Sequence, residues 1–220
     1  MATIRPRLMA AARINRPAIF LYGGSSLPGS YKGKDISIVD VFEGIGAMEK
    51  GLITEDELYE IECNACPGQG SCAGMFTANT MASVGEAIGM SLPGTASIPA
   101  EDIRLRTEAE NTGRQLNYLL KNDIKPRDIM TLNAFKNAVT TVLALGGSTN
   151  AVLHLMAIAH EAKVDLTLNT FDQLGKTVPH IADMKPFGKY HMVDLDNIGG
   201  VPVVSKILLE NNLIDGNCLT

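Results

Sequence analysis

The 220-residue sequence has no tryptophan, only four cysteines and no long apolar run. A membrane-spanning helix needs about 18 to 20 mostly apolar residues, so we expect no membrane partner. Positive charge is not in excess, because 19 Lys and Arg residues stand against 24 Asp and Glu residues, for a formal net charge of −5. Phosphate backbones select basic surfaces, so a nucleic-acid partner is not expected either. The first twenty residues also lack the long apolar core of a secretory signal peptide.

The chain does contain enough apolar material for a packed core. Hydrophobic residues make up 45% of the sequence, which excludes an intrinsically disordered protein. No internal repeat or low-complexity tract divides the chain, and its length fits a single domain over residues 1–220. Because disulfides are rare inside cells, the four cysteines of an intracellular chain are more often ligands, catalytic groups or core residues.

Hydrophobic spacing and capping residues predict a mainly helical chain. The predicted helices cover residues 8–15, 38–50, 54–62, 74–90, 100–121, 131–145, 150–162 and 201–212. Thr54 with Glu57 forms a capping-box pattern at the third helix, and Thr131 can cap the sixth. One short apolar run over residues 18–24, closed by two glycines, is predicted to be a buried strand.

Two of these helices are expected to lie at the centre of the core. The helix over 150–162 has apolar residues on almost every face, so we expect it to be the most buried in the chain. It should pack near the helix over 74–90, whose residues are apolar or small nearly all round. Leu155 is therefore predicted to be a core residue.

Three of the four cysteines lie within ten residues. Cys63, Cys66 and Cys72 give the spacing C-x2-C-x5-C around a Pro-Gly turn. A lone C-x2-C pair is found in zinc sites, in redox pairs and by coincidence. Structural zinc needs four close ligands, and the histidines lie far along the chain: His154, His160, His180 and His191. A thioredoxin-like pair would sit at a strand-to-helix turn, whereas Cys63 and Cys66 are predicted to lie at the end of a polar helix.

Cys72 is the strongest candidate for a metal ligand among these cysteines. It lies at the predicted junction of loop and helix, flanked by Gly70 and Gly74. Glycines allow close backbone approach to a bulky ligand, and a helix N-terminus stabilises a thiolate. These conditions suit a ligand of an iron–sulfur cluster. From spacing alone, three small core cysteines remain an equal alternative.

Other polar groups are weaker candidates. Residues 146–150, Gly-Gly-Ser-Thr-Asn, place backbone amides at a helix start, where a carboxylate or phosphate can bind; ordinary capping is the alternative. His154 and His160 are six residues apart and do not share a helix face, so we interpret them as core or edge residues. A polar helix carries three carboxylates that we interpret as solvent-facing: Asp102, Glu108 and Glu110.

Several long segments resemble one enzyme family. They read ECNACPGQGSCAGMFTANTMASVGEAIGMSLPGTASIPA, ALGGSTNAVLHLMAIAHEA, LMAAARINRPAIFLYGG, VDVFEGIGAMEKG and GGVPVVSKILLENNLIDGNCLT. Together they resemble the dihydroxy-acid dehydratases, members of a dehydratase family that also holds sugar-acid and phosphogluconate dehydratases. The resemblance follows the family order along essentially the whole chain. Within the family, SLPG and ADMKPFGKY look more like the branched-chain amino-acid enzymes.

The resemblance implies an activity and its cofactors. Members dehydrate 2,3-dihydroxy-3-methyl acids to 2-oxo acids in valine, isoleucine and leucine biosynthesis, with an iron–sulfur cluster (2Fe-2S or 4Fe-4S) and Mg²⁺. An iron with an open position takes the leaving hydroxyl, which lowers the barrier to its departure. The family's cluster cysteine in the pattern G-S-C-x-G-M falls on Cys72. Cys66 matches a family cysteine that is not carried over as a ligand.

The resemblance also implies an α/β fold, predominantly helical, with a small parallel sheet flanked by helices. The family's other two cluster cysteines precede the segment at residue 8, one of them in a Cys-Asp-Lys signature that also supplies magnesium ligands. This chain has no cysteine before Cys63, and the family's proposed base, a serine, belongs to a C-terminal domain. We therefore expect an internal fragment, an incomplete N-terminal domain that is inactive alone.

Two further expectations follow from the resemblance. The longer protein is expected to act as a homodimer on a small dihydroxy acid, in the cytoplasm, or in an organelle matrix or stroma if the source is a eukaryote. A sugar-acid or phosphogluconate dehydratase, or a non-catalytic folding or dimer-forming domain, is the alternative.

Overall fold

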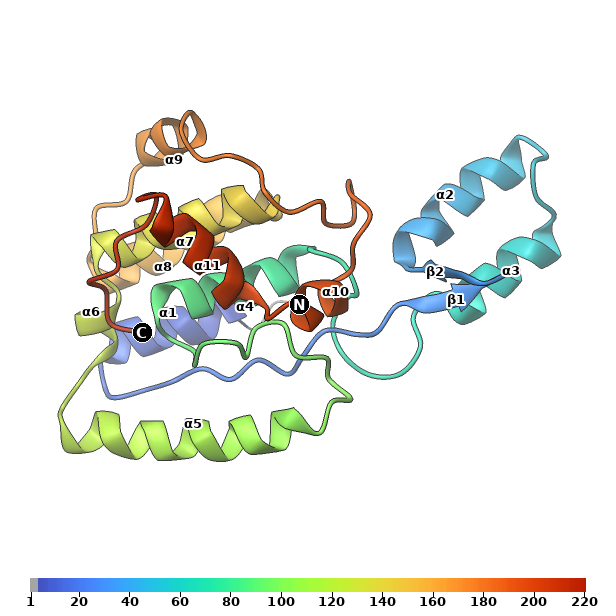
Figure 1. Ribbon diagram of the computed structural model, residues 1–220. Coiled ribbons are helices and arrows are strands. Elements are labelled where there is room, and N and C mark those ends of the chain that lie inside the picture. The colour runs from blue at the N-terminus through green and yellow to red at the C-terminus, as the bar shows by residue number, and fades with distance from the viewer. Residues whose placement is uncertain (1–3) are drawn as a thin grey trace.

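The structure is a computed structural model that describes residues 4–220. Within these residues the chain forms two short strands and eleven helices (Figure 1). The strands are β1 (Gly29–Tyr31) and β2 (Lys34–Ile36). The helices are α1 (Ile4–Ile14), α2 (Ile38–Glu49), α3 (Glu55–Asn64), α4 (Thr77–Ile88), α5 (Arg104–Lys121), α6 (Pro126–Ile129), α7 (Leu132–Leu145), α8 (Asn150–Ala162), α9 (Leu168–Gly175), α10 (Met192–Asn197) and α11 (Val201–Glu210).

The prediction of a mainly helical chain is confirmed, although α6, α9 and α10 lie outside the predicted ranges. Two of the predicted capping signals are also present. The Thr54 hydroxyl accepts a hydrogen bond from the Glu57 amide, and the Glu57 carboxylate accepts one from the Thr54 amide, so α3 begins with a complete capping box. The Thr131 hydroxyl accepts from the amide of Ala134 at the start of α7. That helix ends at Gly146, whose φ of 64° lies in the left-handed region.

The predicted parallel sheet is not confirmed. Residues 18–24 are extended but belong to no ladder, and the two strands form an antiparallel hairpin in which Gly29 pairs with Ile36. The extended run makes only scattered bonds to the segment that follows α4: the Phe20 amide donates to the Met90 carbonyl, and Ser25 forms one isolated parallel bridge with Pro99. Because proline has no amide donor, this neighbouring segment, which carries Pro93 and Pro99, cannot complete a ladder.

The main body packs around α4. This helix contacts α7 most extensively and also touches α1, α8 and α11, so it is covered on nearly every side (Figure 1). Ten of its twelve residues are buried. Most of these residues are small, which lets neighbouring helices approach closely and leaves no side facing water.

The prediction that the helix over 150–162 is the most buried is wrong. Only five of the thirteen residues of α8 are buried, and Leu153 is 67% exposed. This helix packs mainly against α1 and makes a smaller contact with α4. A mainly apolar composition therefore did not mean burial on all sides, because the Leu153 side chain on the outer face of α8 extends into solvent. Leu155 is fully buried, as predicted.

The β-hairpin, α2 and α3 form a lobe, residues 29–65, that projects from the body (Figure 1). The lobe has its own small apolar cluster around Ile36, Val41 and Ala65. Gly29 and Asn64 lie so close that a Cβ on Gly29 would be 1.7 Å from the Asn64 carbonyl oxygen. The two ends of the lobe are therefore held together where the chain leaves and re-enters the body.

None of the helices formed by residues 4–220 is both long enough and apolar enough to cross a lipid bilayer.

Glu86 is a buried carboxylate that organises the loop after α4. Its two oxygens accept hydrogen bonds from the backbone amides of Gly94 and Ala96, at 2.8 and 2.9 Å. Burial raises the pKa of Glu86 to about 7, and the amides of Gly94, Ala96 and Thr95 act in the opposite direction. The loop over 91–99 is thus tied to the centre of the body by one side chain.

We predict that Leu155→Ala lowers the free energy of unfolding by about 2–5 kcal/mol, because the truncation leaves a cavity in a fully packed core. Leu153→Ala, two residues along the same helix and 67% exposed, should change it by less than about 0.5 kcal/mol. Urea unfolding followed by far-UV circular dichroism measures both. Equal midpoints would remove Leu155 from the core.

A second prediction concerns pH. Because the folded-state pKa of Glu86 is raised to about 7, its contribution to stability is present below the unfolded pKa and is lost as pH rises through about 7. Between pH 5.5 and 8 the wild-type chain should lose about 2 kcal/mol from this group. The Glu86→Gln side chain cannot ionise, so this loss should be absent in the variant, whatever its overall free energy of unfolding. Parallel stability–pH curves for the two proteins would contradict the prediction.

Candidate functional site

The cysteine stretch is a loop between α3 and α4. Cys63 lies within the last turn of α3, and Cys66 follows it; both are exposed, whereas Cys72 is partly buried. The helix α4 begins only at Thr77. The expectation that Cys72 lies at the helix start is therefore wrong by one turn, since Phe76 and the residues before it are not helical.

One side chain of α4 holds this loop from inside. The Asn79 side-chain amide donates to the carbonyl oxygens of Cys72 and Gly74, both at 2.6 Å. Its oxygen accepts from the Tyr22 hydroxyl at 2.7 Å and from the Ser71 hydroxyl at 3.2 Å. The two hydroxyls of Tyr22 and Ser71 also contact each other. Every polar atom of the Asn79 side chain thus has a partner in the protein.

The glycines beside Cys72 serve the packing of the backbone. Gly70 has a φ of +124°, and a Cβ there would lie 2.5 Å from the carbonyl group of Ser25. The Ser71 amide donates to the carbonyl of Gly24 close by. We expected the glycines to make room for a ligand, whereas Gly70 makes room for the neighbouring chain segment.

The other side of the loop is held by the segment before α10. The Met75 amide donates to the Lys185 carbonyl at 2.8 Å, and the Met192 amide donates to the Ala73 carbonyl at 2.6 Å. His191 is buried here, with no hydrogen-bond partner for its Nε2 atom. Burial lowers the pKa of His191, although the nearby Asp194 carboxylate opposes this shift. Sequence reasoning missed this histidine because 119 residues separate it from Cys72.

The environment of the Cys72 thiol is less favourable to the thiolate than the sequence suggested. Burial raises the pKa of Cys72, and the proximity of Cys66 raises it further. The backbone amides of Gly74 and Ala73 act in the opposite direction but do not outweigh burial. The thiol therefore favours its protonated form in this environment.

The residues between 4 and 220 do not fit a complete metal centre. No three His, Cys, Asp or Glu side chains among them come together at a spacing that could hold a metal ion. An iron–sulfur cluster is held by several thiolates, and Cys72 alone can supply only one. No set of carboxylates for Mg²⁺ is gathered in this part of the chain either.

Four of the five amides of residues 146–150 have protein partners: those of Gly146, Gly147, Ser148 and Asn150. The Ser148 amide donates to the Thr80 hydroxyl at 3.0 Å, and the Asn150 amide donates to the Ser148 hydroxyl at 3.3 Å. The Asn150 side chain also donates to the Thr77 hydroxyl. The capping alternative therefore describes this turn better than an anion site, because its polar groups join the starts of α4 and α8.

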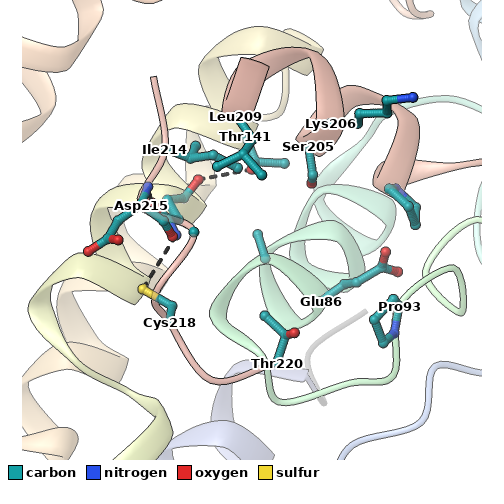
Figure 2. Close-up of a pocket in the computed structure, with 14 residues that line it drawn as sticks. Glu86, Pro93, Thr141, Ser205, Lys206, Leu209, Ile214, Asp215, Cys218 and Thr220 are labelled. Atoms are coloured by element: carbon teal, nitrogen blue, oxygen red, sulfur yellow. Dashed lines mark hydrogen bonds between the residues drawn. The ribbon is translucent and has the colours of Figure 1, made fainter. Parts of the chain in front are cut away.

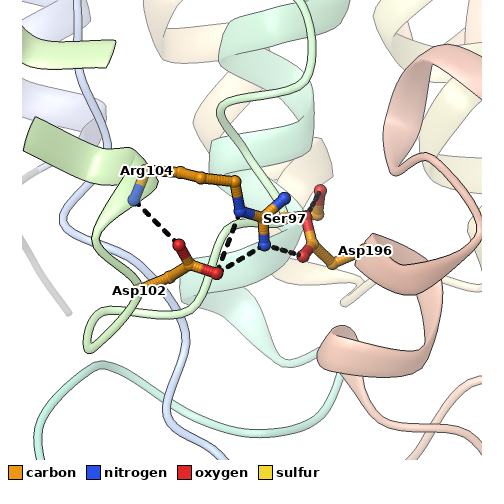
Figure 3. Close-up of polar contacts among 4 residues, drawn as sticks. All are labelled: Ser97, Asp102, Arg104 and Asp196. Carbon is orange, nitrogen blue, oxygen red and sulfur yellow. Dashed lines mark hydrogen bonds and ion pairs between the residues drawn. The ribbon is translucent and has the colours of Figure 1, made fainter. Parts of the chain in front are cut away.

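A second polar cluster ties α10 to the start of α5 (Figure 3). Arg104 forms ion pairs with Asp102 and with Asp196, at 2.6 and 2.5 Å, and Asp196 also accepts from the Ser97 hydroxyl. The guanidinium of Arg104 lowers the pKa of the Asp102 carboxyl. Asp102 was expected on the solvent-facing side of the helix; it lies just before α5, is partly buried and also accepts a hydrogen bond from the Arg104 amide at 2.8 Å.

The remaining sequence candidates lie apart from Cys72. Glu108 and Glu110 are on α5, where they contact Asn111 and Arg114, as expected for a solvated helix face. His160 is exposed, whereas His154 is partly buried between helices, and burial lowers its pKa. Both agree with the interpretation as edge or core residues.

A cavity of about 320 Å³ lies at the far end of α4 (Figure 2). Glu86, Thr141, Lys206 and Cys218 are among its lining residues, and no residue of the cysteine loop is. Its buried carboxylate, Glu86, is already engaged by the loop amides. This cavity is therefore separate from the candidate site.

Comparison with known proteins gives consistent results. Residues 3–220 match the family described as dihydroxy-acid/6-phosphogluconate dehydratase N-terminal. The chain is 57% identical over 213 residues to a dihydroxy-acid dehydratase of Acidothermus cellulolyticus and 54% identical to a dihydroxy-acid dehydratase 2 of Staphylococcus saprophyticus. It is also 54% identical to a dihydroxy-acid dehydratase of Mycobacterium bovis. These alignments cover 97% of this chain but only 38% of each relative's length.

We predict that Gly70→Ala is much more destabilising than Gly33→Ala. Both glycines have positive φ, but a Cβ on Gly33 meets nothing within 4 Å, whereas one on Gly70 collides with Ser25. Gly33→Ala should cost about 1–2 kcal/mol from backbone strain alone, and Gly70→Ala about 1–3 kcal/mol more. Urea unfolding of both variants measures the difference. Equal losses would show that the contact with Ser25 is not tight.

Proposed function

Because the chain belongs to the dihydroxy-acid/6-phosphogluconate dehydratase N-terminal family, we propose that it is part of an iron–sulfur dehydratase that converts 2,3-dihydroxy-3-methyl acids to 2-oxo acids. The observation that carries this proposal is the 52–57% identity to relatives named dihydroxy-acid dehydratase, over 97% of the chain. Identity at this level over a buried core and its loops preserves the fold that positions the site.

We assign Cys72 as the one cluster ligand supplied by the described residues. Its loop is held from three sides, by Asn79, by Ser25 and by the segment around Lys185 and Met192. The other two cysteines differ, because Cys63 and Cys66 are exposed. A ligand on a fixed loop keeps its geometry when a metal centre forms, which favours Cys72.

The cofactors of the proposed enzyme are an iron–sulfur cluster and Mg²⁺, and its substrate is a small dihydroxy acid bound by the longer protein as a homodimer. Cys72 would be one ligand of the cluster, which would supply Lewis-acid chemistry for the departure of a hydroxyl group. Since residues 4–220 gather no three-ligand set, the 220-residue chain should be inactive alone. We propose the cytoplasm as its location, with no nucleic-acid or membrane partner.

The test uses the Acidothermus cellulolyticus relative as a frame. Its aligned 213-residue segment is replaced by the corresponding residues of this chain, and the hybrid is purified anaerobically. We expect turnover of 2,3-dihydroxyisovalerate together with bound iron and sulfide. Cys72→Ser should lower both the activity and the amount of bound iron by about tenfold to a hundredfold, because a ligand is lost. Cys63→Ser is the matched control and should keep both.

Two results would contradict the proposal. If Cys72→Ser kept full iron while Cys66→Ser lost it, the ligand assignment would be wrong. Turnover of 6-phosphogluconate in place of the dihydroxy acid would favour the other branch of the family. A well-folded hybrid that turned over neither compound would leave the domain with a folding or dimer-forming role.

A further inference from the structure

Asn79 is the residue through which the body controls the loop of Cys72. We propose that Asn79 is a positioning residue: its side-chain amide fixes the backbone on both sides of Ala73 and so sets the exposure and direction of the Cys72 thiol. The inference deepens the proposed function, on which it rests for the role of Cys72. Its test measures the reactivity of the Cys72 thiol in the absence of any cluster, so this inference and the proposed function can fail separately.

The geometry of the donor side supports this role. Both bonds from the Asn79 amide nitrogen, to the carbonyls of Cys72 and Gly74, measure 2.6 Å. Cys72 and Gly74 are the residues on either side of Ala73, so the two bonds hold the backbone of residues 72–74. One NH₂ group therefore uses both of its hydrogens to hold a three-residue turn against α4.

The acceptor side fixes the orientation of the same amide. The hydroxyl of Tyr22 donates to the Asn79 oxygen at 2.7 Å, and the hydroxyl of Ser71 contacts the same atom at 3.2 Å. A rotation of the amide by 180° would set its oxygen against two carbonyl oxygens and its NH₂ group against the hydroxyls. Because Asn79 is fully buried, water cannot replace any lost bond.

Ser83 is a buried polar residue of α4 whose side-chain hydrogen bond stays within the helix. It is buried one turn after Asn79, and its hydroxyl donates to the carbonyl of Asn79 within α4. Its bond does not leave the helix, whereas the bonds of Asn79 all reach other segments. Ser83→Ala is therefore a matched control for the loss of a buried hydrogen bond in α4.

The experiment measures alkylation of the reduced 220-residue chain by iodoacetamide at one fixed pH. Peptide mass spectrometry gives separate rate constants for Cys72 and for the exposed Cys66, and their ratio is the readout. In Asn79→Asp the two donors are lost with little change of shape. The ratio of the Cys72 rate to the Cys66 rate should rise by about tenfold, since the freed carbonyls release the loop. In Ser83→Ala it should stay within about twofold of the wild-type ratio.

Urea separates positioning from general destabilisation. If Cys72 became accessible only through global unfolding, its rate would increase steeply with low urea, because global unfolding exposes a large surface. For Asn79→Asp we expect the higher ratio of the Cys72 rate to the Cys66 rate already without urea. That ratio should then stay nearly constant as urea is added at low concentration. If Asn79→Asp does not fold, Tyr22→Phe replaces it as the test variant. This change removes the Tyr22 hydroxyl that helps to orient the Asn79 amide. It should also raise the ratio of the Cys72 rate to the Cys66 rate.

Either of two results would overturn the proposal. One is an unchanged ratio in a folded Asn79→Asp chain, or in Tyr22→Phe if Asn79→Asp does not fold. The other is an equal rise in Ser83→Ala, which would reduce the role of Asn79 to that of any buried hydrogen bond.

Discussion

The rest of the structure depends on the burial of α4. With ten of its twelve residues buried, the polar side chains of this helix cannot be satisfied by water and must find partners in the protein. Asn79 binds the cysteine loop, Thr80 accepts from the amide of Ser148, and Glu86 accepts from the loop that follows the helix. Each of these residues attaches a different loop to the same central helix. The burial that stabilises the body therefore also fixes three loops around α4, one of which carries Cys72.

The local parts of this arrangement could be predicted from the sequence. Capping residues and hydrophobic spacing act over a few residues, so α3 and α7 begin at the expected capping threonines, Thr54 and Thr131. The sheet could not be predicted in this way, because pairing depends on the partner segment. Residues 18–24 have the composition of a strand, but the segment beside them carries prolines and offers too few donors.

The candidate site was predictable only in part. Flanking glycines and a predicted helix start favoured Cys72 over Cys63 and Cys66, although spacing alone left a core role equally open, and the resemblance to a family then singled out Cys72. Asn79 gave no local signal, since an asparagine in the first turn of a helix usually reads as a capping residue. Its function depends on Tyr22, which is 57 residues away in the sequence. The burial of α8 was predicted wrongly for a related reason. Composition indicates which residues can be buried, but the positions of the neighbouring helices determine which residues of α8 are buried.

The lobe over residues 29–65 is joined to the body by two chain segments that are braced against each other at both ends. Gly29 lies against Asn64 at the lobe, and Gly70 lies against Ser25 at the body. The two segments are therefore in close contact at both ends, where a side chain on either glycine would collide with the other segment. Cys66 lies between these two contacts in the sequence, and Cys72 follows Gly70 by two residues. The turn that carries the proposed ligand thus begins at the same close contact that joins the lobe to the body.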